Sequence, residues 1–152
     1  MHAYSNYVIA FKGSKSAKAK ATRVLSEKIG DDEALELDVV QVEENYEVVW
    51  FEDLVEMATE MAKAAPSVKF AMRGYVDCTE SCGEFVPFAI TYADKNLIAR
   101  GTSWICDYDR LDQLDDEILC EISDDDITNG FFEDLLEAID GDKYDDIECI
   151  EI

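Results

Sequence analysis

The chain lacks most of the residues and motifs on which common enzyme mechanisms depend. Its one histidine, His2, lies near the start of the chain, where side chains are seldom held among the partners that a catalytic triad needs. The phosphate-binding, dinucleotide-binding, nucleophile-elbow and HExxH zinc patterns are all absent from the sequence. Pairs of carboxylates carry no information in a chain with 36 acidic residues, because such pairs arise by chance. We therefore predict a protein without enzymatic activity, catalytic residues or a cofactor.

Basic residues are scarce and unevenly distributed. The chain has 13 Lys and Arg against 36 Asp and Glu, a formal net charge of -23. Residues 1–30 hold six basic residues and one acidic residue, a net charge of +5, whereas residues 105–152 hold two basic and nineteen acidic residues, a net charge of -17. Such an acidic surface repels the phosphates of nucleic acids and of anionic lipids, and it attracts basic surfaces. We expect the partner to be a basic protein, and neither nucleic acid nor a membrane.

A secretory signal is also lacking, as is any apolar run near the roughly 20 residues that a membrane span needs. The five cysteines are an odd number, which in this context favours reduced thiols in a cytoplasmic protein. Cys78 and Cys82 form a CxxxC pair in a predicted loop. Free thiols are the favoured interpretation of this pair, and a disulfide or one half of a zinc site are the alternatives.

The acidic runs do not form a calcium-binding loop of the EF-hand type. Frames that begin at Asp124, Asp125 or Asp140 each lack the glutamate at position 12 or another required residue. We predict no specific metal site, and loose binding of divalent ions by clustered carboxylates is the alternative.

Apolar periodicity predicts an α+β domain. Alternating or β-branched runs predict strands over residues 4–11, 35–39, 47–51, 68–76, 85–92 and 97–105, and a short strand over residues 147–152. Helical spacing predicts helices over residues 14–29 and 54–65, with Ser14 and Asp53 as N-caps, Gly30 as a C-cap and Pro66 as a stop. Residues 43–45 and 93–96 are predicted turns, and Pro87 indicates a sheet edge or a bulge.

The order of the first six elements matches a ferredoxin-like β-α-β-β-α-β plan, an antiparallel sheet with both helices on one face. A β-hairpin extension and a C-terminal acidic helical segment follow, with helices predicted over residues 111–122 and 131–139. We predict a single domain over residues 1–152, with an α+β core over residues 1–106 and an acidic helical extension over residues 107–152.

Part of this pattern resembles a known family. Trp50 and Phe51 precede the predicted helix, and Ala65-Pro66 is followed by Val68, Phe70, Arg73, Tyr75 and the loop ESCGEF at residues 80–85. Together with the opening YSNYVIAFKG, these residues resemble the YubB-type ferredoxin-like domains of phage and plasmid proteins over residues 4–105. The resemblance implies a ferredoxin-like fold and a mobile-element or accessory protein, and it implies no activity.

The charge pattern favours a nucleic-acid mimic that inhibits a basic nuclease or defence protein. An immunity protein for a basic toxin is a close variant of this hypothesis. Acidic side chains would stand in for phosphates, and neighbouring aromatic side chains would supply desolvated anchors. The predicted partner-binding residues are Trp104, Asp107, Tyr108, Asp109, Asp112, Asp115, Asp116, Glu117, Asp124, Asp125, Asp126, Phe132, Glu133, Asp134 and Glu137.

Two alternatives stay open. The first is an accessory protein that binds a small ligand or a divalent metal ion at the loop of residues 78–84 and the sheet face. The second is self-association, in which the basic helix over residues 14–29 docks on the acidic region, either in the same chain or in a second copy to form a homodimer.

Overall fold

The computed structural model describes residues 3–35, 37–78, 84–101, 104–105 and 146–151. These residues form an α+β structure with two α-helices and an antiparallel sheet. In chain order, the elements are β1 (Tyr4–Lys12), α1 (Lys15–Ile29), the short 3-10 helix η1 (Asp32–Ala34), β2 (Val39–Asn45), α2 (Phe51–Ala64), β3 (Lys69–Cys78), β4 (Glu84–Ala93), β5 (Asn96–Gly101), β6 (Trp104–Ile105) and β7 (Asp146–Glu151).

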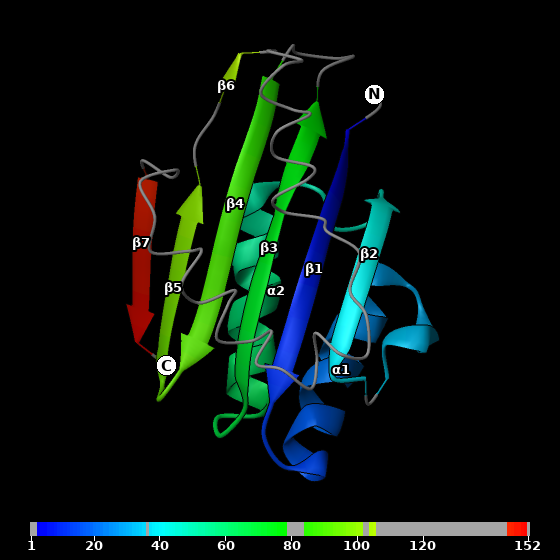
Figure 1. The fold of residues 1–152 in the computed structure, drawn as a ribbon, viewed down its shortest axis with the longest axis vertical. Helices are drawn as coiled ribbons and strands as arrows, with labels where there is room; N and C mark the ends of the chain where they lie inside the picture. Colours follow the sequence, from blue (N-terminus) through cyan, green and yellow to red (C-terminus); the bar gives the residue numbers. More distant parts are fainter. Residues whose placement is uncertain (1–2, 36, 79–83, 102–103, 106–145, 152) are drawn as a thin grey trace.

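The described strands form one sheet with the order β2-β1-β3-β4-β5-β7, and β6 pairs with β4. Every pairing is antiparallel. Both helices lie on the same face of this sheet, with α1 behind β1 and β2 and α2 behind β3 and β4 (Figure 1). Helices on one face are what the sequence predicts.

The core lies between the two helices and the sheet. Alternation along β1 turns Tyr7, Ile9 and Phe11 toward the helices, and Phe70 and Met72 of β3 follow the same pattern. Each helix buries one apolar stripe at a spacing of three or four residues, made of Ala17, Ala21, Leu25 and Ile29 in α1 and of Leu54, Met57, Ala58, Met61 and Ala62 in α2. These stripes fix the helices against the sheet.

The ends of α1 are those that the sequence predicts. The Ser14 hydroxyl accepts a hydrogen bond from the Ala17 backbone N–H at 3.1 Å, as an N-cap does. Gly30 ends the helix in the left-handed conformation, with φ of 73°, and its N–H donates to the carbonyl oxygen of Ser26 at 3.0 Å.

The segment between the helices differs from the prediction, and the ferredoxin-like element order is therefore wrong. One strand, β2, replaces the two predicted over residues 35–39 and 47–51, so the described order, η1 aside, is β-α-β-α followed by the five strands β3 to β7. The Asp31 carboxylate caps η1, which holds the chain out of a strand before Leu35. The Asn45 side chain accepts from the N–H groups of Glu47 and Val48, which turns the chain where the second strand was expected.

Two further predictions for this segment are wrong: Asp53 as the N-cap of the second helix, and a turn at residues 43–45. The helix begins at Phe51 with Trp50 as its N-cap residue and no side-chain cap, so Asp53 lies in the first turn. An acidic residue in the first turn still interacts favourably with the helix dipole. Residues 43–45 form the end of β2, where Glu44 adopts a positive φ of 45°.

The C-terminal half of the sheet follows the prediction more closely. The turn between β4 and β5 has positive φ at Asp94 and Lys95, 51° and 66°, as in a two-residue hairpin turn of type I′. The predicted strand 97–105 is divided into β5 and β6, and Pro87 falls between the pairs Phe88–Gly101 and Phe85–Trp104. A proline fits there because it has no N–H to donate. The strand predicted over residues 147–152 is confirmed as β7, which pairs with β5.

The Tyr7 hydroxyl yields the first prediction. Tyr7 is fully buried, and its hydroxyl has no hydrogen-bond partner among the described residues. Burial raises the pKa of this hydroxyl, so it stays neutral and keeps a proton that it donates to no described acceptor. We expect Tyr7→Phe to increase the free energy of unfolding by about 1 kcal/mol in urea denaturation, because an unsatisfied polar group is removed.

Tyr92 provides the matched control for this substitution. Its hydroxyl donates to the carbonyl oxygen of Pro66 at 2.8 Å. Tyr92→Phe should therefore cost about 1 kcal/mol. A loss of stability in Tyr7→Phe as large as that in Tyr92→Phe would contradict the prediction.

Candidate protein-interaction surface

The exposed large apolar side chains of the described structure lie in one stretch of the chain. They are Leu35, Leu37, Tyr46 and Trp50, with exposed fractions of 42%, 44%, 59% and 38%. Single exposed apolar residues are ordinary, but a pair of them on each side of β2, within sixteen residues of the chain, makes this segment a candidate binding surface. We call the exposed side chains of residues 31–56 the 31–56 surface.

The same stretch is strongly acidic. Residues 29–62 contain twelve acidic residues and no basic residue. Ten of these acidic side chains belong to the 31–56 surface: Asp31, Asp32, Glu33, Asp38, Glu43, Glu44, Glu47, Glu52, Asp53 and Glu56. Apolar and acidic side chains thus alternate over one continuous segment that includes β2.

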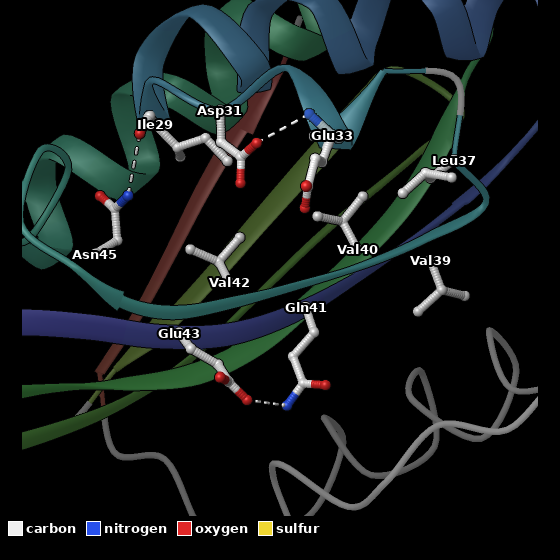
Figure 2. A pocket seen from close by; sticks show the side chains of 11 residues that line it. Ile29, Asp31, Glu33, Leu37, Val39, Val40, Gln41, Val42, Glu43 and Asn45 are labelled. Atoms are coloured by element: carbon white, nitrogen blue, oxygen red, sulfur yellow. Dashed lines mark hydrogen bonds between the residues drawn. The ribbon is translucent and has the colours of Figure 1, made fainter.

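A first cleft, of about 250 Å³, lies between the end of α1, η1 and β2 (Figure 2). Val40 and Val42 point from β2 into the layer between the strand and the helices, whereas Gln41 and Glu43 point the other way. Asp31 and Glu33 approach from the connection above, where the Asp31 carboxylate accepts from the Glu33 N–H at 2.9 Å. We call this the β2 cleft.

A second cleft, of about 370 Å³, lies beside Tyr46 and Trp50, with Glu47 and Asp53 also in its wall. Hydrogen bonds fix the backbone below it. Ser5 Oγ donates to the carbonyl oxygen of Val48 at 2.7 Å. The Asn45 side-chain oxygen accepts from the N–H of Glu47 at 3.0 Å and of Val48 at 2.9 Å. The aromatic residues are therefore displayed on a loop of fixed conformation.

Tyr4 of β1 supports the ring of Tyr46. The two ring centroids are 5.8 Å apart with an interplanar angle of 60°. The Tyr4 hydroxyl donates to Asp77 Oδ2 at 3.0 Å. Burial, together with the hydrogen bond to Asp77 and the negative charge nearby, raises the pKa of Tyr4 to about 12. Tyr4 thus stays neutral over the physiological range, and this hydrogen bond orients its ring.

The basic helix α1 contacts this acidic segment within the chain. Lys18 forms an ion pair with Asp38, and Lys28 Nζ lies 3.0 Å from Glu60 Oε2. The hydrogen bond and the negative charge of Glu60 raise the pKa of Lys28. These partners are not part of the acidic C-terminal region on which the sequence predicts that the helix docks. Any contact of α1 with residues 107–140 lies outside the described part of the chain.

The shape of the 31–56 surface suits a protein partner better than a small ligand. Pockets for drug-sized ligands usually measure about 300–1,000 Å³ and are largely apolar. The β2 cleft, of about 250 Å³, is smaller than this, the second cleft, of about 370 Å³, is near the lower end of the range, and acidic side chains line both. Among the described residues, no three His, Cys, Asp or Glu side chains are grouped as a metal site. Neither described helix has the length and apolar character needed to cross a membrane.

Most of the predicted partner-binding residues lie outside the described residues. Trp104 belongs to β6, where its backbone pairs with Phe85 of β4. The others, from Asp107 to Glu137, fall within residues 106–145, as do the two predicted acidic helices and the calcium-loop frames at residues 124–140. Of the CxxxC pair, Cys78 is buried at the end of β3 and Cys82 is outside the described residues.

The 31–56 surface is the part of the site that the sequence analysis missed. The available signal was the absence of any basic residue over positions 29–62. Leu35 and Leu37, which the sequence predicts to lie in a strand over residues 35–39, precede β2 and are both exposed.

Comparisons with known proteins do not identify the chain: it matches no family model, no curated protein and no solved structure. The resemblance to YubB-type domains stays a prediction.

Proposed function

We propose that this chain is a non-enzymatic protein-interaction module that binds a basic partner protein. The observation that carries the proposal is the coincidence of two features on the 31–56 surface. The exposed large apolar side chains of the described residues lie there, in a stretch of twelve acidic residues without a basic one. Acidic charge alone is common on soluble proteins, whereas exposed aromatic residues such as Tyr46 and Trp50 are enriched in the centre of interfaces, within a polar rim.

The two kinds of side chain have separate roles in this proposal. The carboxylates attract a basic surface and accelerate encounter, an effect that salt screens over roughly 8–10 Å. Trp50 and Tyr46 then provide anchors whose burial supplies affinity that charge alone does not. The cleft beside them accepts side chains of the partner.

The sharper form of the proposal is a nucleic-acid mimic that inhibits a basic nuclease or defence protein, with an immunity protein for a basic toxin as its near variant. The 31–56 surface and the acidic residues from Asp107 to Glu137 would then both stand in for phosphates. The support for this form is the charge density, because the partner of a phosphate mimic is itself basic.

The test begins with capture of proteins from a cell lysate at low salt, followed by titration of the purified captured protein. We expect the dissociation constant to rise at least tenfold between about 50 and 200 mM salt, and DNA or RNA to compete. Trp50→Ala should weaken binding by about 10- to 100-fold, as the loss of an interface anchor does.

Two sets of charge variants show which acidic segment binds. One set combines Glu43→Gln, Glu47→Gln and Asp53→Asn, and the other combines Asp124→Asn, Asp125→Asn and Asp126→Asn. Asp94→Asn, on the β4–β5 turn, is the control for a single exposed acid elsewhere. Affinity that is independent of salt and of both sets would refute the proposal.

A further inference from the structure

Strand β2 is an edge of the described sheet, because among the described strands it pairs with β1 alone. The Phe11 N–H donates to the carbonyl oxygen of Asp38 at 2.7 Å, which fixes the phase of the ladder. In an antiparallel pair, every second residue exchanges hydrogen bonds with the neighbour, so Val40 and Val42 bond to β1. The N–H and C=O groups of Val39, Gln41 and Glu43 therefore face away from β1, along the outer edge.

Acidic side chains lie on both sides of this edge. Asp31 and Glu33 line the β2 cleft on the helix side, and Glu43 extends on the other side (Figure 2). Leu37, which is 44% exposed, adds an apolar contact at one end of the cleft. Lys18 of α1 forms an ion pair with Asp38, which directly precedes the strand.

We propose that the β2 edge takes up an extended, basic segment of the partner protein as an added strand. This proposal rests on the proposed function and states how the partner is bound. Backbone hydrogen bonds to Val39, Gln41 and Glu43 would hold the segment, as in other cases of strand addition. Because side chains alternate along a strand, basic residues on one side of the segment meet Asp31 and Glu33, and those on the other side meet Glu43.

A second copy of the chain is a poorer occupant of the same edge. Pairing β2 with β2 would bring two strands with the same acidic side chains together, and like charges on adjacent strands destabilise a sheet. The edge is also protected at one end, because the register with β1 shifts between Ser5 and Tyr7 and Glu44 adopts a positive φ. The accessible part is thus short, from Val39 to Glu43.

The test uses the peptide acetyl-Lys-Val-Lys-Thr-Lys-Val-Lys-amide and measures its binding by calorimetry at about 50 mM salt. Gln41→Pro removes an outward N–H and leaves the hydrogen bonds to β1 in place, which an edge strand tolerates. We expect this variant to bind the peptide at least tenfold more weakly, whereas Gln41→Ala, which keeps the N–H, binds as the original chain does. Urea denaturation checks that Gln41→Pro is folded.

Peptide controls make the test independent of that variant. The same sequence with alternate N-methylated residues cannot form the strand hydrogen bonds, and a helical peptide of Lys and Ala with equal charge tests attraction alone. Binding of the N-methylated and helical peptides as strong as that of the extended one would overturn strand addition and leave the proposed function standing. No binding of any basic peptide would overturn both. If sedimentation shows a dimer of the chain that Gln41→Pro dissociates, the occupant of the β2 edge is a second copy of the chain, and the proposal of a basic partner segment is overturned.

Discussion

Substituting alanine for Gly74 is expected to remove about 3 kcal/mol or more from the free energy of unfolding. Gly74 of β3 pairs with Tyr7 of β1 in the centre of the sheet. A Cβ at this position would lie 1.9 Å from the backbone oxygen of Asn6, 2.4 Å from Tyr7 Cβ and 2.6 Å from Tyr7 Cα. Two of these atoms are backbone, so the strands themselves must separate, which costs more than a side-chain adjustment.

Gly30 is the matched control for Gly74→Ala in urea denaturation. No heavy atom lies within 4 Å of a Cβ built on Gly30, but its φ is +73°. Gly30→Ala should therefore cost about 1 kcal/mol, from the left-handed backbone alone. If Gly74→Ala were no worse than Gly30→Ala, the close approach of β1 and β3 would be refuted.

Truncation of Phe88 is the second large effect, with an expected loss of about 3–5 kcal/mol in Phe88→Ala. Phe88 of β4 is fully buried, and its ring centroid lies 6.0 Å from that of Tyr7 and 6.3 Å from that of Phe51. The ring thus joins the sheet to the start of α2. Its removal leaves a cavity at the junction of three elements, which the surrounding backbone cannot fill.

Tyr46→Ala is the control for Phe88→Ala, because it removes an exposed aromatic ring instead of a buried one. Tyr46 is 59% exposed, so its truncation should change the free energy of unfolding by no more than about 0.5 kcal/mol. The expected pattern is a stable Tyr46→Ala that binds its partner weakly and a Phe88→Ala that unfolds easily. Similar stability of the two variants would contradict the assigned core.

Sequence patterns predict most of the fold where local and tertiary preferences agree. The apolar stripe of α1, with Ser14 and Gly30 at its ends, specifies that helix, and the same holds for β1, β3 and the β4–β5 hairpin. The failure lies between the helices. The run Val48-Val49-Trp50-Phe51 has the composition of a strand, but hydrogen bonds from Ser5 and Asn45 hold its start as a turn. Of these two contacts, the one between Ser5 and Val48 is long-range and leaves no local signal.

The candidate surface was harder to predict because the sequence does not indicate where in an alternating run the strand begins. Leu35, Leu37 and Val39 alternate with acidic residues, as the buried side of a strand would. In the structure the period-two pattern belongs to Val40 and Val42 instead, one position out of phase. Leu35 and Leu37 precede β2, so they are not part of its alternation and both stay exposed.

The place of β1 in the sheet has a consequence for synthesis of the chain. β1 pairs with β2 and β3, and both are translated after it. The apolar stretch from Tyr7 to Phe11 therefore cannot pair with both neighbouring strands until Cys78 has been synthesised. An uncharged strand that is not yet paired is prone to aggregate. The lysines that follow at once, from Lys12 to Lys20, keep nascent chains apart by repulsion. The basic helix thereby protects the unfinished sheet, whatever the finished protein binds.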